Sequence, residues 1–191
     1  MNDPIVPDDK DWTWVLERPC PDCGFDARAI DVTSDVASDV DGVGTLIRAN
    51  AAAWVEVLGG DDGAVRRRPT PDCWSSLEYG AHVRDVFVLF RERLTSMLCS
   101  DDPLFANWDQ DATAVASRYD LQDPSDVAVE LQVAADELGA AFDGVEGEQW
   151  RRPGRRSDGA VFTVESFARY LLHDPIHHLW DVTHGDLQSG G

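Results

Sequence analysis

The 191-residue sequence has little positive charge, since 16 lysines and arginines stand against 36 aspartates and glutamates, and Lys10 is its one lysine. The net charge of −20 would repel a phosphate backbone, so nucleic acid is not an expected partner. Long hydrophobic runs are missing too, because no run approaches the roughly 18 apolar residues that cross a bilayer. The acidic N-terminus lacks the layout of a signal peptide, and we therefore expect a cytoplasmic protein without membrane attachment.

Cysteine is also scarce, with four residues in the chain. In a cytosol these are reduced thiols or metal ligands rather than a disulfide framework. Cys20 and Cys23, in the run Cys-Pro-Asp-Cys-Gly, form one half of a zinc knuckle, but Cys73 and Cys99 lack the spacing of a second half. The pair therefore fits a tight loop stabilised by its thiols, a redox switch, or zinc shared with another chain. Cys99, at the apolar end of a predicted helix, is expected in the core.

Length and composition suit one globular domain with a short appendage. Residues 1–30 contain Trp12, Trp14 and the cysteine pair but show no sustained helical period. We expect an irregular N-terminal extension whose tryptophans dock onto the main body. Residues 31–186 are expected to form that body, and residues 187–191 a disordered tail.

Four stretches with helical apolar spacing make up the expected body. The first covers residues 33–58 and is stopped by Gly-Gly-Asp-Asp-Gly. The second starts at a capping box of Ser75 and Glu78, and the third at the N-cap Asp123, with proline in the first helical position. The fourth begins after a cap by Thr163. Strand signals are confined to short runs such as Ala-Val-Phe-Thr-Val.

The connections between these helices are long, with more than 20 residues between the second and third and about 20 between the third and fourth. Helices joined in this way need not be antiparallel neighbours, so the predicted fold class is all-α, a four-helix bundle with long crossover loops. Trp108, Tyr119 and Trp150 lie in these connections. Such aromatic residues indicate that the loops are ordered and cover part of the bundle.

The run His-Asp-Pro-Ile-His-His-Leu-Trp-Asp in the fourth helix holds three of the five histidines. Two pairs in it are four residues apart and so share a helix face, His173 with His177 and Asp174 with His178. His82, beside the apolar stripe of the second helix, would supply a third ligand. Two ligands from one helix and one from a facing helix make a site with an open fourth position, the pattern of a catalytic zinc site.

Helix geometry favours the second pair. At about 100° per residue, Asp174 and His178 lie about 40–80° from the centre of the apolar stripe, whereas His173 and His177 lie about 140–180° away. A carboxylate on the apolar face needs a counter-charge or a metal to offset its desolvation. Pro175 leaves two alternatives, a kink that rotates the register to His173 and His177, or a helix that restarts with Asp174 as its N-cap. His173 is expected to be partly exposed.

Two segments, WSSLEYGAHVRDV (residues 74–86) and HHLWDV (residues 177–182), resemble the DinB/YfiT-like superfamily, which includes the mycothiol-dependent maleylpyruvate isomerases. The similarity extends over most of residues 35–185. The resemblance implies a four-helix bundle that binds one divalent metal, with zinc and nickel as the leading candidates. The metal is held by a histidine of the second helix and by an acid-or-histidine and histidine pair, four apart, in the fourth.

Where the family has two adjacent histidines, the second is the usual ligand, so the resemblance implies a metal site of His82, Asp174 and His178. Asp174 departs from the family, which more often has histidine or glutamate there. Three protein ligands leave positions for water or a substrate thiol, whose pKa the metal lowers. His177 and Asp181 are expected to contact the metal ligands rather than the metal, and one of them is expected to orient His178 through its other ring nitrogen.

A basic loop, Arg-Arg-Pro-Gly-Arg-Arg, gathers four arginines in six residues of a very acidic chain: Arg151, Arg152, Arg155 and Arg156. Two interpretations stand side by side. The arginines form salt bridges with acidic neighbours at the surface, or they recruit an anionic substrate to the mouth of the bundle, since guanidinium groups bind carboxylates in a two-pronged fashion.

These features predict a divalent-metal-binding protein, an S-transferase or isomerase that uses a low-molecular-weight thiol such as mycothiol on a small electrophilic or anionic substrate. Two alternatives remain open. One is a metal-binding stress or interaction protein without turnover, and the other is a metal-dependent hydrolase with the same ligands. A small molecule is the expected partner, and the sequence is compatible with a homodimer.

Overall fold

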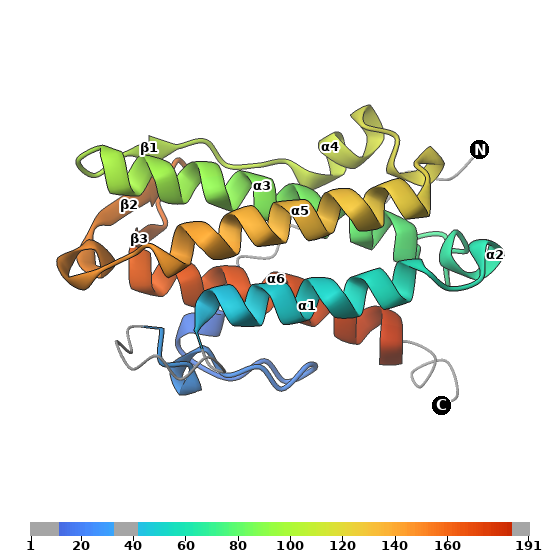
Figure 1. The fold of residues 1–191 in the computed structure, drawn as a ribbon, viewed down its shortest axis with the longest axis horizontal. Helices are drawn as coiled ribbons and strands as arrows, with labels where there is room; N and C mark the ends of the chain where they lie inside the picture. The colour runs from blue at the N-terminus through green and yellow to red at the C-terminus, as the bar shows by residue number, and fades with distance from the viewer. Residues whose placement is uncertain (1–11, 33–41, 185–191) are drawn as a thin grey trace.

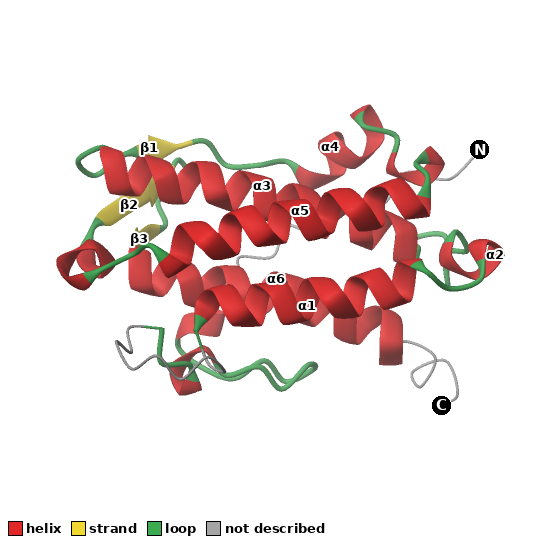
Figure 2. Ribbon diagram, in the orientation of Figure 1, coloured by secondary structure: helices red, strands yellow, loops and turns green. Residues whose placement is uncertain are grey.

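Four long helices form the body of the protein in the computed structural model, which describes residues 12–32 and 42–184 (Figure 1). They are α1 Val43–Leu58, α3 Ser76–Cys99, α5 Pro124–Asp143 and α6 Val164–His184. Two short helices, α2 Asp62–Val65 and α4 Gln110–Ala116, lie in the connections. The strands are equally short: β1 Leu104–Phe105, β2 Pro153–Arg156 and β3 Val161–Thr163 (Figure 2). The predicted all-α bundle is confirmed.

Three of the predicted helix starts are confirmed by their capping bonds. Ser75 Oγ accepts a hydrogen bond from the Glu78 backbone N–H at 3.3 Å, and the Glu78 carboxylate accepts one from the Ser75 N–H at 2.9 Å. The carboxylate of Asp123 caps α5, which begins with proline. Thr163 Oγ1 accepts from a backbone N–H in the first turn of α6 at 3.1 Å. Unpaired N–H groups at a helix start are satisfied in this way.

The first helix begins later than the sequence pattern predicts. Gly42 has an extended backbone (φ −72°, ψ 151°), so α1 starts at Val43. Residues 33–41, where the predicted helix began, lie outside the described residues, and so does the tail predicted at residues 187–191.

The bundle is not a simple up-and-down arrangement. In Figure 1 the chain runs from left to right along α1 and α6 and from right to left along α3 and α5. The parallel helices α3 and α5 pack against each other, and α5 also packs along α1. Helix α6 lies against both α1 and α3. The long α3–α5 connection is therefore a crossover, as its length predicted.

The core between the four helices is apolar and closely packed, which removes a large apolar area from water and drives folding. Its largest fully buried side chains come from all four helices and include Trp54, Ile47, Phe87, Leu94, Leu131, Phe142, Phe167 and Leu171. Cys99 is exposed, so its predicted place in the core is wrong. It stands after Met97, the last buried residue of α3, where the bundle ends.

The aromatic residues of the long connections are ordered, as predicted. Tyr119 is buried and its hydroxyl donates to the Asp85 carboxylate at 2.5 Å. Trp150 stacks on Phe142 with ring centroids 6.3 Å apart. The small sheet closes one end of the bundle, with β1 parallel to β2 and β2 antiparallel to β3 (Figure 2).

The N-terminal segment, residues 12–32, lies against α6 through two single-turn 3-10 helices, Trp12–Leu16 and Ala27–Ala29. Its own side chains Val15, Cys20 and Phe25 are buried. The docking predicted for the extension is thus seen in its described part. Within the described ranges, no helix is long and apolar enough to cross a membrane.

Candidate metal centre

Helix α6 is continuous through Pro175. Proline lacks the N–H that would bond to the carbonyl one turn earlier, a loss that normally weakens a helix interior. Here the Pro175 carbonyl accepts hydrogen bonds from the side chains of Asn50 at 3.1 Å and Trp54 at 3.3 Å, which fasten α6 to α1. Asp174 is therefore an interior residue of α6, and the alternative in which it is an N-cap is wrong.

The three residues expected as metal ligands come together between α3 and α6, and we call them the three-ligand cluster: His82, Asp174 and His178. One potential ligand atom from each lies within 4.8 Å of the others. His82 Nε2 is 3.3 Å from Asp174 Oδ1, and His178 Nε2 is 3.9 Å from Asp174 Oδ2. Two nitrogen or oxygen ligands of one tetrahedral zinc ion stand ~3.3 Å apart, given bonds of about 2.0–2.1 Å. The cluster is thus close to the dimensions of a metal site.

Buried polar atoms in this cluster form no well-aligned hydrogen bond, although His82 Nε2 and Asp174 Oδ1 lie close together. His82 is fully buried, and neither of its ring nitrogens forms a hydrogen bond to a described residue; Asp174 Oδ1 is equally without one. An unsatisfied buried polar atom costs roughly 1–3 kcal/mol. One divalent cation bound by His82 Nε2 and the carboxylate would remove that cost for both, so the residues present fit a metal.

Electrostatics keep the Asp174 carboxyl ionised. Burial by itself raises its pKa, but the charges that His82 and His178 hold when protonated outweigh burial and bring the pKa to about 2. The side chains of Asp174 and His178 remain 33% and 15% exposed, while that of His82 is inaccessible. The solvent-accessible part of the cluster is therefore on its α6 side.

Aromatic rings hold the histidines in place. Trp108, from the α3–α5 connection, stacks on His82 with centroids 5.3 Å apart and planes 4° from parallel. Trp74 packs on the same imidazole at 5.4 Å. Tyr79, one turn before His82 on α3, lies 4.7 Å from the His178 ring. The connection that contains Trp108 thus forms one wall of the cluster.

Asp181 stands behind His178, as the sequence indicated. His178 Nδ1 and Asp181 Oδ2 are 3.2 Å apart. Since a carboxylate only accepts, Nδ1 is the donor in this contact, and the Nε2 edge of the ring faces Asp174. His177, the other residue expected behind the ligands, is placed differently: its Nδ1 is 3.5 Å from Cys20 Sγ, although its Nε2 also lies 3.7 Å from Asp181 Oδ2.

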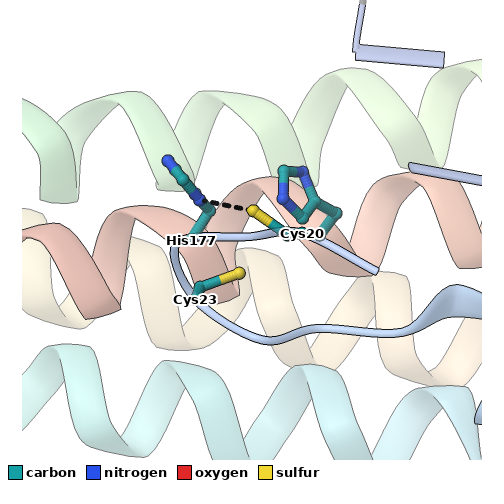
Figure 3. Close-up of side chains that lie close together, drawn as sticks. Cys20, Cys23 and His177 are labelled. Carbon is teal, nitrogen blue, oxygen red and sulfur yellow. Dashed lines mark hydrogen bonds between the residues drawn. The ribbon is translucent and has the colours of Figure 1, made fainter. Parts of the chain in front are cut away.

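A second group of potential ligands surrounds that contact. We call it the four-ligand cluster: Cys20, Cys23, His173 and His177. Its potential ligand atoms also lie within 4.8 Å of one another, and Figure 3 shows both cysteines and His177 where the N-terminal segment crosses α6. Its two histidines are the pair that sequence analysis kept as an alternative register. The structure assigns each pair on α6 to its own cluster.

The expectation that His173 is partly exposed is wrong, because the side chain is only 2% exposed. It does point away from the bundle, but residues 12–32 cover that face, with Trp12 and Phe25 packed 5.1 and 5.7 Å from its ring. Burial, followed by the charge of His177, lowers the pKa of His173 to about 4. The imidazole is therefore neutral at physiological pH.

Three of the four loop arginines do not face the three-ligand cluster. Arg151 pairs with Glu148, and both side chains are largely exposed. Arg152 donates to backbone carbonyls at the end of α3, and Arg155 pairs with Asp102. For these three the surface salt-bridge interpretation describes the structure.

Arg156 differs because strand alternation turns it inward, and it is 9% exposed. It pairs with Asp158 and donates to the Tyr170 hydroxyl at 2.9 Å. Tyr170 precedes Asp174 by one turn on the same face of α6. Arg156 therefore stands on the same side of α6 as the three-ligand cluster, about one helical turn further along.

A second buried cation, Arg93, was not expected from the sequence. It is 6% exposed and follows His82 by eleven residues, a spacing that returns to the same helix face. Burial, together with the charge of Arg156, lowers its pKa to about 10. An arginine within the apolar period of the second predicted helix was the available signal. The Arg93 guanidinium donates to the Ala106 carbonyl at 2.8 Å, and Arg156 has Asp158 as its acidic partner.

Comparisons with known proteins agree with this fold. The family model described as the DinB superfamily matches residues 45–182. A solved structure, YfiT from Bacillus subtilis, is described as a probable metal-dependent hydrolase with an unusual four-helix bundle topology. The two structures superpose with a TM-score of 0.69, and their sequences are 18% identical. The match covers 82% of this chain and 91% of the YfiT chain. No curated protein matches.

Proposed function

Because the chain belongs to the DinB superfamily, we propose that it is a metal-dependent enzyme whose metal is held by His82, Asp174 and His178. One observation supports this site above others: His82 Nε2 and Asp174 Oδ1 are buried, 3.3 Å apart and without hydrogen-bond partners among the described residues. A divalent ion, zinc or nickel, suits two imidazoles and a carboxylate. When bound, it would act as a Lewis acid and lower the pKa of a thiol or water at its open position.

The residues of the chain itself would then position the reactants. Asp181 would orient the His178 ring so that Nε2 faces the cluster. The rings of Trp74 and Trp108 fix His82 and keep water away from it. Partial exposure of Asp174 leaves the approach open on one side.

The substrate that this arrangement favours is a small anion. Arg93 on α3 and Arg156 on β2 are both buried near Tyr170, and guanidinium groups bind carboxylates in a two-pronged fashion. We propose an electrophilic carboxylate, bound by these arginines, that meets a low-molecular-weight thiol such as mycothiol at the metal. The reaction is then an S-transfer or a thiol-assisted isomerisation.

Hydrolysis is the second candidate, and the similar protein YfiT, itself described as a probable metal-dependent hydrolase, favours it. The same ligands would serve, with water in place of the thiol. The two reactions differ in what they consume, so they can be separated by experiment.

The test measures turnover by protein loaded with zinc or nickel. One arm offers carboxylate-bearing electrophiles with mycothiol or another small thiol and follows loss of the thiol; the other offers carboxylate-bearing esters and amides without thiol. We expect thiol-dependent turnover that His82→Ala and Asp174→Asn both abolish together with the metal. Glu56→Gln, an exposed change on α1, is the matched control.

Turnover only in the thiol-free arm would replace the transferase by a hydrolase. Full metal content in the His82→Ala variant would overturn the site assignment. Stoichiometric metal at this site with no turnover in either arm would instead leave a metal-binding protein without catalysis.

A further inference from the structure

We propose that the N-terminal segment is fastened to α6 by a second, closed zinc site with four protein ligands: Cys20, Cys23, His173 and His177. The proposal does not depend on the activity proposed above, because it uses none of the residues of the three-ligand cluster.

The spacing of the four residues is that of a structural zinc site. A Cys-x2-Cys pair and a His-x3-His pair are the two halves of Cys2His2 zinc ligation. The sequence shows the first half of such a site in Cys20 and Cys23, but no second Cys-x2-Cys pair. The fold supplies the second half from α6, about 150 residues along the chain, within the same molecule.

Distances in the four-ligand cluster agree with one shared ion. All four potential ligand atoms lie within 4.8 Å of one another, and Cys20 Sγ is 3.5 Å from His177 Nδ1. A sulfur and a nitrogen bound to one tetrahedral zinc stand ~3.6 Å apart, given bonds of about 2.3 and 2.0–2.1 Å. In Figure 3 the two sulfurs and the His177 ring approach one another above α6.

The backbone around the cysteines has the form of a ligand loop. The Cys20 N–H donates to the Phe25 carbonyl at 2.8 Å, and the Gly24 N–H donates back to the Cys20 carbonyl at 3.0 Å. Gly24 has a φ of +73°, a left-handed conformation that a residue with a side chain rarely adopts. The turn brings the two sulfurs to the same side, toward α6.

Burial argues against a cluster that merely packs. Cys20 and His173 are each 2% exposed, and His173 Nε2 has no hydrogen-bond partner among the described residues. A disulfide between Cys20 and Cys23 would leave that buried nitrogen without a partner. A zinc ion uses it as a ligand, and two thiolates neutralise the ion, which suits a surrounding of Trp12 and Phe25 rings.

The two clusters therefore differ in role. Three protein ligands leave a position open, whereas four fill the tetrahedral shell of zinc and exclude substrate. The four-ligand cluster is a structural site that holds residues 12–32 against α6.

Cobalt substitution of the full chain tests the proposal. Cobalt bound by two thiolates gives a thiolate-to-metal charge-transfer band in the near-ultraviolet, together with the intense visible bands of tetrahedral coordination. A site without cysteine cannot give the near-ultraviolet band. We expect this band in the wild type and in His82→Ala, and its loss in the double variant Cys20→Ser, Cys23→Ser. Cys99→Ser, an exposed cysteine outside both clusters, is the matched control.

Elemental analysis of protein purified without added metal gives a second readout. The wild type should hold two metal ions per chain if both sites exist, and the double cysteine variant should lose one equivalent of zinc. If the three-ligand cluster binds no metal but the four-ligand cluster does, the wild type should hold one zinc per chain and the charge-transfer band should remain. Absence of that band from the cobalt-loaded wild type, or a Cys20–Cys23 disulfide in its mass spectrum, would overturn the proposal without recourse to any variant.

Discussion

His177 and His178 are consecutive in the chain, yet their side chains enter different clusters on adjacent faces of α6. His177 Nδ1 faces Cys20 Sγ at 3.5 Å, while His178 Nε2 faces Asp174. The remaining nitrogen of each ring approaches the same oxygen, Asp181 Oδ2, at 3.7 Å from His177 and 3.2 Å from His178. One carboxylate therefore stands behind ligands of both clusters.

The shared carboxylate predicts that Asp181→Asn weakens metal binding at the three-ligand cluster. An amide is neutral and is a weaker acceptor for His178 Nδ1–H, and loss of such a partner typically costs about 10–100-fold in metal affinity. Competition with a chromophoric chelator measures the affinity. Glu56→Gln should leave it unchanged, and an unaltered affinity in Asp181→Asn would show that the carboxylate does not support the ligand.

Arg156→Gln should raise the KM for carboxylate-bearing substrates. Loss of a hydrogen bond to a charged group costs about 1.5–3 kcal/mol, which corresponds to about 10–100-fold in KM. Steady-state kinetics on a charged substrate and its neutral amide analogue measure the effect, which should be confined to the charged one. Arg151→Gln, in the same loop but exposed, is the control. An equal effect on both substrates would indicate a structural role.

Removal of metal should release the N-terminal segment. If the four-ligand site holds residues 12–32 on α6, a strong chelator should expose this segment to limited proteolysis while the helices of the bundle stay protected. Mass spectrometry of the fragments locates the cuts. The double variant Cys20→Ser, Cys23→Ser should be cut there without chelator, and Cys99→Ser should not. Equal resistance with and without chelator would argue that apolar packing alone holds the segment.

Glu78 predicts a pH-dependent contribution to stability. It is 4% exposed, and its carboxylate accepts from Arg68 Nε at 2.9 Å and from the Ser75 hydroxyl at 2.8 Å. Burial raises the pKa of Glu78, but these donors outweigh it, so the pKa in the folded protein is lowered. The stabilisation is therefore complete above the unfolded pKa, about 4.3, and is lost as the pH falls through the lower folded value.

Glu78→Gln should accordingly lower the free energy of unfolding by about 3–5 kcal/mol at neutral pH, since it leaves the largely buried Arg68 unpaired. The difference from the wild type should shrink at an acid pH below the lowered pKa of Glu78 in the folded protein, where the wild-type carboxyl also becomes neutral. Guanidinium denaturation at the two pH values measures this, with Glu56→Gln as the control. A difference independent of pH would assign the loss to packing rather than charge.

Local signals in the sequence were sufficient for most of the helical framework. Ser75, Asp123 and Thr163 cap helices where their spacing predicted, because capping bonds form within four residues of chain. The start of α1 and the place of Cys99 could not be read in this way. The first depends on Gly42, and the second on where the other helices stop covering α3.

The geometry of the candidate site likewise follows partly from local sequence spacing and partly from the tertiary fold. The sequence by itself determined that His173 pairs with His177 and Asp174 with His178, because residues four apart share a helix face whatever the fold. It also determined, from the apolar stripe, which pair turns toward His82. Only the tertiary structure decided that the outward pair is covered by Cys20 and Cys23, since no local rule links residues about 150 positions apart. That contact depends on how the N-terminal segment packs on α6 in three dimensions, which no sequence spacing encodes.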